Sequence, residues 1–229
     1  MVIYGRNAVR EALRGPRTVH HVWASKNALR ETWVGQGQTP VEAVAADELE
    51  RRCGSGDHQG ICAEVSEFAY ADPATLLVPG AGVLLALDQI QDPQNLGAIC
   101  RSAECAGARG VVIPARRSAE VTPAVCKASA GAVEHLSVAR VGNLADFLGQ
   151  AKVAGMWCYG ADASSELVYD EIDYSGGTVL VLGSEGKGLR PRVAGACDAL
   201  VAIPLRGRTE SLNVAAAAAV LLYAAVPRA

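Results

Sequence analysis

The chain has 229 residues, of which 50% are apolar and 20% charged, and its formal net charge at pH 7 is −3. No apolar run approaches the roughly 20 residues that span a bilayer, which excludes an integral helical membrane protein. The negative charge excludes a protein that coats nucleic acid through bulk electrostatics, because nonspecific affinity depends on many phosphate contacts. The opening MVIYGRNAVREAL has no pattern of an export signal. We therefore expect a globular cytoplasmic protein whose contacts with any nucleic acid are local.

Cysteine and histidine usage argues against disulfides and metals. The seven cysteines form no CxxC pair, are odd in number and mostly lie among apolar residues, which favours reduced, buried thiols. The four histidines lack metal-ligand spacing, so we expect no metal. Arginine clusters such as Arg116/Arg117, Arg190/Arg192 and Arg206/Arg208 suit phosphate binding through the planar guanidinium. Such clusters also occur simply as solvated surface.

Residues 1–66 are predicted to form a small α/β domain. The predicted elements are a helix over 6–13, a strand over 18–23, a helical stretch near 26–33, a strand near Val41, a helix over 47–52 and a strand over 61–65. The glycine-rich segment 54–60 is predicted to be a mobile loop. Residues 67–82, which contain Pro73, Pro79 and two glycines without periodicity, are predicted to be a linker.

From residue 83 to 229, short apolar runs alternate with helical patterns, which indicates a parallel sheet covered by helices on both faces. The expected strands are VLLALD, GVVIP, LSVAR, MWCYG, TVLVLG and LVAIPL. The expected helices begin after Asn95, begin at Thr122, span 144–153 and begin after Ser211. Ligands of open parallel sheets bind beyond the carboxyl ends of the strands. Three loops are therefore the candidate site: DQIQDPQN, GSEGKG and LRGRTESLN.

The first loop runs from Asp88 into a helix of small residues. Asn95 suits an N-cap, with Leu96, Ile99, Ala103 and Ala106 as the buried stripe. Arg101 beside a helix N-terminus suits a phosphate. The alternative is that Asn95 only caps the helix and Arg101 only faces solvent.

The other two loops have different chemistry. In LGSEGKGL, around Glu185, the glycines do not match a Walker or dinucleotide-binding spacing. They indicate instead a backbone that approaches a flat ligand closely, with one carboxylate displayed. In IPLRGRTESLNV, Ser211 is predicted to be the N-cap of the alanine-rich helix that follows.

Together the segments NLGAICRSAECAG, VLGSEGKGL and IPLRGRTESLNVA closely resemble, in order and separation, the three motifs of the SpoU (TrmH) family of SPOUT RNA ribose 2′-O-methyltransferases. The resemblance spans Asp88 to the C-terminus. The front block, with IYGRNAVREAL and HQGICAEV, resembles the ribosomal-protein-L-thirty-like substrate-binding domain of RlmB-like ribosomal RNA enzymes. The one departure from the motifs is Ala215, where relatives usually have serine.

The resemblance implies an α/β fold with a C-terminal trefoil knot that binds S-adenosylmethionine, and a homodimer with its active site at the subunit interface. The implied cofactor-binding residues are Gly183, Ile203 and Leu212. The implied catalytic residues are Asn95, Arg101, Glu185, Ser211 and Asn213. Since a guanidinium is almost never deprotonated in proteins, we expect Arg101 to bind phosphate and stabilise a developing alkoxide. Proton abstraction by Arg101 is the alternative.

The RlmB-like architecture implies structured RNA as the partner, with a guanosine of 23S ribosomal RNA as substrate in preference to transfer RNA. A transfer RNA enzyme and a ribosomal RNA methyltransferase that confers antibiotic resistance are alternatives that share these motifs. A non-catalytic RNA-binding protein is a further alternative, which the intact polar residues of the three motifs disfavour. The failed glycine fingerprints disfavour a nucleotide-dependent oxidoreductase or kinase.

Overall fold

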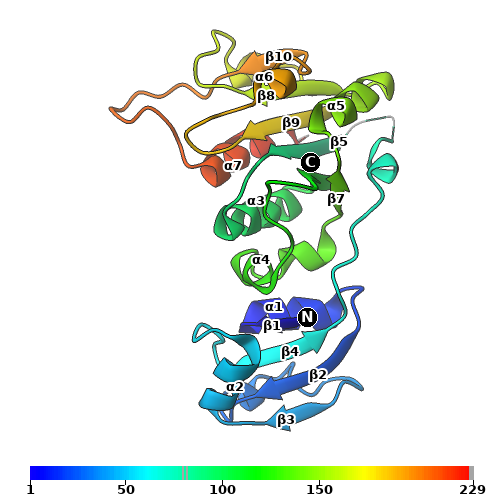
Figure 1. The fold of residues 1–229 in the computed structure, drawn as a ribbon, viewed down its shortest axis with the longest axis vertical. Coiled ribbons are helices and arrows are strands. Elements are labelled where there is room, and N and C mark those ends of the chain that lie inside the picture. The colour runs from blue at the N-terminus through cyan, green and yellow to red at the C-terminus, as the bar shows by residue number, and fades with distance from the viewer. Residues whose placement is uncertain (79, 81, 227–229) are drawn as a thin grey trace.

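The computed structural model describes residues 1–78, 80 and 82–226, and it contains two sheets along the chain. Figure 1 shows the smaller sheet at one end of an elongated molecule and the larger sheet at the other. The predicted linker, residues 67–82, connects them through the 3-10 helix η2 (Pro73–Leu76), and its residues 79 and 81 lie outside the described residues. The proposed domain boundaries stay a prediction.

The front domain is a four-stranded sheet in the order β1-β4-β2-β3, with α1 on one face and α2 on the other. Its elements are β1 (Val2–Tyr4), α1 (Arg6–Arg14), β2 (Val19–Ala24), η1 (Ala28–Arg30), β3 (Val41–Ala43), α2 (Ala46–Cys53) and β4 (Ile61–Val65). The apolar side chains of β2 and β4 alternate between the two faces because successive side chains in a strand point to opposite sides.

One prediction for this domain was wrong, and one strand was not predicted. The unpredicted strand is β1, which is only three residues long and gains its hydrogen bonds by pairing antiparallel with β4, more than fifty residues along the chain. The helical stretch expected over residues 26–33 is only the single turn η1. Only Ala28 of that turn is buried, so packing does not extend the helix.

The second domain confirms the predicted α/β architecture. Its six-stranded sheet has the order β10-β8-β9-β5-β6-β7, and all five pairings are parallel. The strands are β5 (Gly82–Asp88), β6 (Gly110–Pro114), β7 (Val138–Val141), β8 (Trp157–Ala161), β9 (Gly177–Gly183) and β10 (Ala199–Val201). The helices are α3 (Pro93–Cys105), α4 (Pro123–Ala128), η3 (Ala132–His135), α5 (Leu144–Val153), η4 (Tyr169–Glu171), α6 (Pro191–Ala194) and α7 (Val214–Ala225). The short helix α6 was not predicted.

Both faces of this sheet are covered, as the run VLLALD indicates for a central parallel strand. Leu85 and Leu87 of β5 belong to the core beneath α3, α4 and α7, whereas Leu84 and Ala86 belong to the core beneath α5. α7 packs against α3 and β9. The trefoil knot that the resemblance implies stays a prediction.

The two domains share a packed interface between α1 and β1 on one side and α4 and η3 on the other (Figure 1). One continuous apolar core crosses it, joining Val9 of α1 to Val125 of α4. Gly131 lies so close to α1 that a Cβ atom there would come within 2.6 Å of the Glu11 side chain.

A buried ion pair lies at this interface. The Arg17 Nε atom is 3.0 Å from Glu134 Oε2, and the two side chains are 5% and 0% exposed. Burial raises the pKa of Glu134, and the positive charge of Arg17 opposes that rise. A second pair joins the His135 Nε2 atom to Glu11 Oε2 at 3.0 Å. The interface is therefore held by charge pairing as well as by apolar packing.

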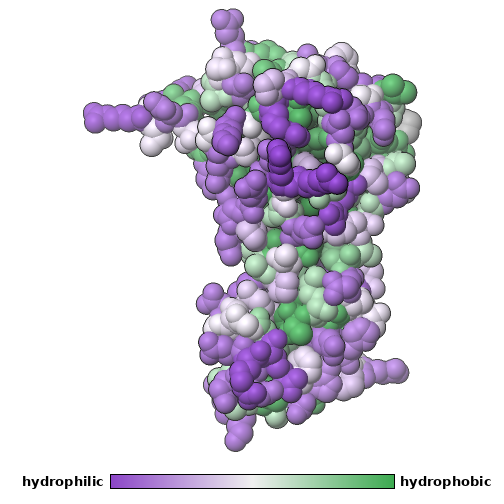
Figure 2. Space-filling view, viewed as in Figure 1, coloured by the Kyte–Doolittle hydropathy of each residue, from purple (hydrophilic) through white to green (hydrophobic). Residues whose placement is uncertain are grey.

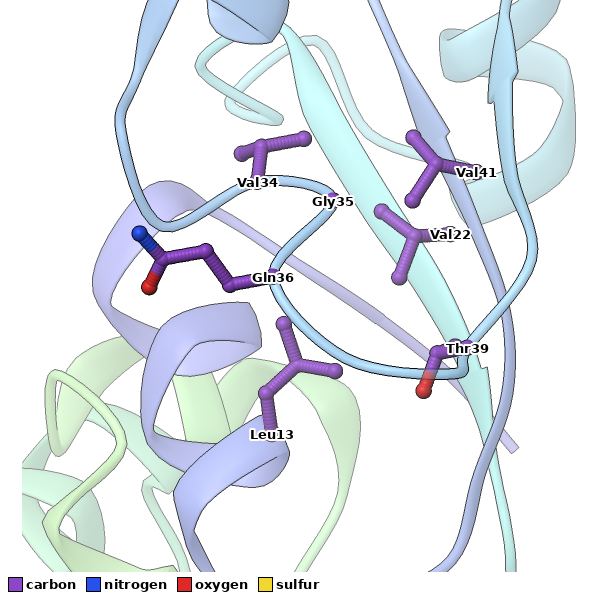
Figure 3. Close-up of a pocket in the computed structure, with 7 residues that line it drawn as sticks. All are labelled: Leu13, Val22, Val34, Gly35, Gln36, Thr39 and Val41. Carbon is purple, nitrogen blue, oxygen red and sulfur yellow. The ribbon is translucent and has the colours of Figure 1, made fainter.

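A small apolar cavity lies within the front domain (Figure 3). It is lined by Leu13, Val22, Val34, Gly35, Gln36, Thr39 and Val41. Its volume of about 10 Å³ is room for about one water molecule, so the cavity is too small for a cofactor or a nucleotide.

The cysteines are all unpaired, and burial raises the pKa of Cys62, Cys100, Cys126, Cys158 and Cys197 to about 12. These thiols are therefore protonated and poorly reactive near neutral pH.

Among the described helices, none has the length and apolarity needed to cross a bilayer. Among the described residues, no group of three or more potential ligands is placed to hold a metal ion.

The buried ion pair yields a stability prediction. Glu134→Gln keeps the side-chain shape but leaves the Arg17 charge buried without its partner, which typically costs about 3–5 kcal/mol. Asp146→Asn is the matched control, because Asp146 pairs with Arg192 on the exposed surface, where such pairs contribute about 0–1 kcal/mol. The free energy of unfolding in urea measures both. Equal losses in the two variants would show that the interface pair adds nothing beyond a surface pair.

Candidate active site

Three polar side chains from distant parts of the chain meet at the carboxyl edge of the larger sheet. Asn95 lies in the first turn of α3, Glu185 follows β9, and Asn213 precedes α7. Asn213 Nδ2 donates to Asn95 Oδ1 at 3.0 Å and to Glu185 Oε1 at 3.2 Å. Asn95 Nδ2 also donates to Glu185 Oε1. These three residues form a closed hydrogen-bond network, which we call the Asn–Glu–Asn network.

The helix caps differ from the predictions. Asp92, not Asn95, caps α3: its side chain accepts from Gln94 N at 2.9 Å, and Pro93 takes the first helical position. Proline is preorganised there and lacks the N–H that would otherwise need a partner. Asn95 is thereby released to bond across the site. Both of its partners lie on other segments.

Ser211 was likewise wrongly predicted to cap α7. Asn213 performs that role, since its Oδ1 accepts from Ala215 N at 2.9 Å and from Ala216 N at 3.4 Å. The same amide therefore serves two purposes: its oxygen closes the helix and its nitrogen joins the network. Ala215 contributes through its backbone N–H, which the usual serine would also supply.

The network leaves one carboxylate oxygen of Glu185 free to accept hydrogen bonds from a bound molecule. Asn95 is buried, at 8% exposure, whereas Glu185 is exposed. Both amide bonds to Glu185 end on Oε1. Among the described residues, Glu185 Oε2 has no hydrogen-bond partner, so a carboxylate oxygen held in a fixed position is available to a bound molecule.

The loop after β9 folds back tightly on the strand. A Cβ atom on Gly183 would come within 2.1 Å of the Gly188 carbonyl carbon, so only glycine fits. Asp88, at the end of β5, holds the far end of this loop: its Oδ2 accepts from Arg190 N at 2.9 Å and its Oδ1 from Arg190 Nε at 2.8 Å. Asp88 is 1% exposed. These two residues position the loop that carries Glu185.

The Asp88–Arg190 pair was missed by the sequence analysis. Asp88 was read only as the start of a polar loop, and Arg190 only as part of an arginine cluster. A lone carboxylate at the end of an otherwise apolar strand was the available signal, because a buried charge needs a partner. Nothing in the sequence identified that partner, which lies 102 residues away.

The segment between β10 and α7 has an unusual backbone. Residues 203–212 form no backbone hydrogen bonds with the described residues, and they extend away from the domain (orange in Figure 1) as an arm with a hydrophilic tip (Figure 2). Leu205 and Leu212 are 37% and 42% exposed. Free N–H and C=O groups beside exposed leucines suit a partly apolar ligand held through the backbone.

Arg101 and Ser211 do not join the network. Both are exposed, and neither forms a side-chain hydrogen bond or ion pair with any described residue. Arg101 is six positions beyond Asn95 on α3, which in an α-helix is about 9 Å along the axis and about 120° around it. Of the predicted catalytic residues, the chain alone therefore brings together Asn95, Glu185 and Asn213. Gly183, Ile203 and Leu212 lie where the strands β9 and β10 end and just before α7.

Comparison with known proteins agrees with this arrangement of motifs. Residues 82–223 match the SpoU rRNA Methylase family, and residues 2–71 match the family described as RNA 2′-O ribose methyltransferase substrate binding. The chain belongs to the SpoU family. It is thus an RNA methyltransferase, as the motifs predicted.

Curated relatives of this SpoU family member are RNA methyltransferases by name. The putative TrmH family tRNA/rRNA methyltransferase YacO of Bacillus subtilis is 38% identical, over 96% of this chain and 93% of the relative. An uncharacterized tRNA/rRNA methyltransferase of Mycolicibacterium gilvum is 42% identical, over 96% and 74%. A Synechocystis relative is 39% identical, and the match covers 61% of its length.

Solved structures match both domains. The SpoU methyltransferase AviRb from Streptomyces viridochromogenes, crystallised with AdoMet, has a TM-score of 0.83 at 26% identity and covers 99% of this chain and 89% of its own. An AdoMet-bound rRNA methyltransferase from Sinorhizobium meliloti has a TM-score of 0.81 at 27% identity and covers 98% and 85%. The two-domain α/β fold is therefore that of SpoU methyltransferases.

Substitutions at Asn213 separate its two purposes. Asn213→Ala removes the cap and is expected to cost about 1 kcal/mol of stability, whereas Asn213→Ser keeps a capping oxygen and costs only a few tenths. Both lose the amide nitrogen that positions Asn95 and Glu185, so both are expected to lose RNA methylation on the order of 100-fold. Urea unfolding and turnover are measured on the same samples. Full turnover by the serine variant would mean that the network is dispensable.

Proposed function

We propose that this protein transfers a methyl group from S-adenosylmethionine to a ribose 2′-hydroxyl of RNA, with S-adenosylhomocysteine as the leaving group and the hydroxyl proton released to water. The observation that carries the proposal is the Asn–Glu–Asn network, which joins one side chain from each of the three motif segments at the carboxyl edge of the sheet. Ligands of open parallel sheets bind at this edge.

The residues present fit S-adenosylmethionine. The unpaired backbone of residues 203–212 offers donors and acceptors to an adenine ring and a ribose, and Leu205 and Leu212 offer apolar contact. Gly183, Ile203 and Leu212 are the residues proposed to hold it. When bound, S-adenosylmethionine supplies an electrophilic methyl group on a sulfonium. Its electrophile is already activated, so the protein has to orient the nucleophile.

The side chains have distinct roles in this proposal. Asn95 and Asn213 fix Glu185 so that its free carboxylate oxygen can accept a hydrogen bond from a substrate group. Ser211, on the exposed arm, contacts the ribose. Arg101 remains a cation, because guanidinium groups are almost never deprotonated in proteins. It binds the neighbouring phosphate and stabilises negative charge that develops on the 2′-oxygen.

Ribosomal RNA is the proposed substrate class, with a guanosine of 23S RNA as the specific target. The matched substrate-binding family over residues 2–71 supports this proposal, since neighbours that share both domains include a protein named as an rRNA methyltransferase. The A. aeolicus TrmH/SpoU tRNA modifying enzyme, by contrast, has a TM-score of 0.57 at 26% identity and covers 67% of this chain and 78% of its own. Transfer RNA is the second candidate, and a cytoplasmic location goes with either.

The experiment that tests the function uses methyl-labelled S-adenosylmethionine with unmodified 23S transcript and, separately, bulk transfer RNA. Ribose methylation makes the adjacent phosphodiester resistant to alkali, so the labelled position can be mapped. Label at one resistant guanosine of the 23S transcript is the expected result. Label in transfer RNA alone would show that transfer RNA, and not 23S RNA, is the substrate. Absence of S-adenosylmethionine binding in calorimetry would overturn the proposal.

A homodimer with its active site at the subunit interface is part of the proposal. Its support is the position of Arg101, which is exposed and lies about 120° around α3 from Asn95, the residue of the Asn–Glu–Asn network on that helix. In a two-fold dimer, the same surface of both subunits meets. Arg101 is then supplied to the network of the partner subunit.

Mixing two inactive variants tests this arrangement. If Arg101 and Asn213 serve one site from opposite subunits, mixed dimers of Arg101→Ala and Asn213→Ala contain one intact site. Random exchange at equal concentrations then restores about a quarter of wild-type turnover. If both residues serve the site of their own subunit, every site carries a defect and mixing restores nothing. Each variant alone, put through the same exchange, is the control.

A further inference from the structure

Two neighbouring arginines lie outside the network, in the loop that follows β6. Arg116 and Arg117 are both exposed, and neither forms a hydrogen bond or an ion pair with any residue that the structure describes. Arg117 has a positive φ of 58°, which is uncommon for a residue with a long side chain. The loop leaves the sheet at its carboxyl edge, the same edge as the proposed active site.

This loop is held firmly on the side of the active site. Ser118 Oγ donates to the carbonyl oxygen of Ile90 at 3.1 Å, and Ala119 N donates to the same oxygen at 2.8 Å. Ile90 lies between Asp88, which holds the Glu185 loop, and Asp92, which caps α3. Ser118 and Ala119, which directly follow the two arginines, thus bond to the segment that positions the network.

The loop is held equally firmly on its other side. Arg140 of β7 donates to the Ala115 carbonyl oxygen at 3.1 Å, pairs with Glu120 at 2.9 Å and lies over the Tyr70 ring, 5.0 Å from its centroid. Val121 N donates to the Tyr70 hydroxyl at 2.9 Å. These contacts hold the loop in place, and none of them involves the side chain of Arg116 or Arg117.

Arginines elsewhere are used differently. Most of those that the structure describes pair with carboxylates, namely Arg6, Arg10, Arg14, Arg17, Arg51, Arg52, Arg140, Arg190 and Arg192. In a chain of net charge −3, neutralised arginines contribute little to the attraction of an anion. Cations that remain unneutralised beside the active site therefore dominate the local field there.

From this geometry we infer that Arg116 and Arg117 form a phosphate-binding site for the RNA strand next to the methylated nucleotide. The inference rests on the proposed RNA methylation. Guanidinium groups bind phosphate oxygens through two parallel hydrogen bonds. Contacts of this kind set the position of an RNA on a protein without reading its bases. Arg116 and Arg117 hold the strand, while the network and Arg101 act on the ribose.

The test compares Arg116→Ala/Arg117→Ala with Arg14→Ala/Arg192→Ala. The control removes the same charge from two exposed arginines that pair with Glu11 and Asp146. We expect the first variant to raise the KM for RNA about tenfold at about 0.1 M salt and to reduce the slope of log affinity against log salt by about 1.4–1.8, as loss of two phosphate contacts predicts. kcat at saturating RNA and the Kd for S-adenosylmethionine stay within twofold of wild type.

Failure of the phosphate site at Arg116 and Arg117 can be distinguished from failure of the proposed RNA methylation. Normal KM and salt slope in the double alanine variant, with an active wild type, would overturn the phosphate site and leave methylation intact. Arg116→Lys/Arg117→Lys is expected to restore the salt slope but only part of the affinity, because lysine is a point charge. If wild type methylates no RNA, the proposed function fails first. The salt slope of RNA binding by fluorescence anisotropy then still decides whether these arginines contact phosphate.

Discussion

The side-chain amide of Asn213 is the interaction on which the candidate site depends. Its oxygen satisfies two backbone N–H groups at the start of α7, and its nitrogen bonds to Asn95 and Glu185. A single planar group thereby ties the last helix to α3 and to the loop after β9. The start of α7 and the positions of the two other side chains cannot be varied independently. The site is built into the secondary structure that supports it.

Around this amide, charge is distributed in two ways. Structural pairs, such as Asp88 with Arg190 and Arg17 with Glu134, are buried at least on the carboxylate side and hold segments together. Some arginines on the elements that form the candidate site, Arg101 among them, are exposed and have no carboxylate partner within the part of the chain that the structure describes. A protein with a negative net charge can bind a polyanion in this way, because its positive field is concentrated where the substrate must lie.

Much of the fold could be predicted from the sequence, because the spacing of apolar residues and the length of each apolar pattern define the long helices and strands. Five strands of the larger sheet and the ten-residue helix α5 (Leu144–Val153) follow directly from their apolar patterns, whereas the predicted strand LVAIPL overruns β10, which ends at Val201. Short elements such as β1 could not be predicted, since their stability comes from a strand far along the chain. The substrate-binding domain and the SpoU family were found through resemblance of motifs. Periodicity alone indicated no more than an α/β protein.

For the site, the residue types were predicted and their connections were not. Asn95 and Ser211 were both assigned as caps because each precedes an apolar run, yet Asp92 and Asn213 are the caps. Several candidate capping residues lie close together at each helix start, and capping preference alone does not choose among them. Tertiary contacts decide, by drawing Asn95 into the network. Arg101 was identified from the sequence, but its role is not visible in a single chain, because it has no hydrogen-bond or ion-pair partner among the described residues.

The interface between the two domains has a consequence for the kind of substrate the protein can accept. The apolar core runs unbroken from α1 to α4, and a buried ion pair crosses it. These contacts fix the position of the front domain relative to the second domain. The distance from a contact on the front sheet to the reactive ribose is then set by the protein. An RNA that engages both domains has to match that span through its own folding. The fixed distance therefore favours targets whose three-dimensional RNA fold fits both domains, with little need for the protein to read the base sequence.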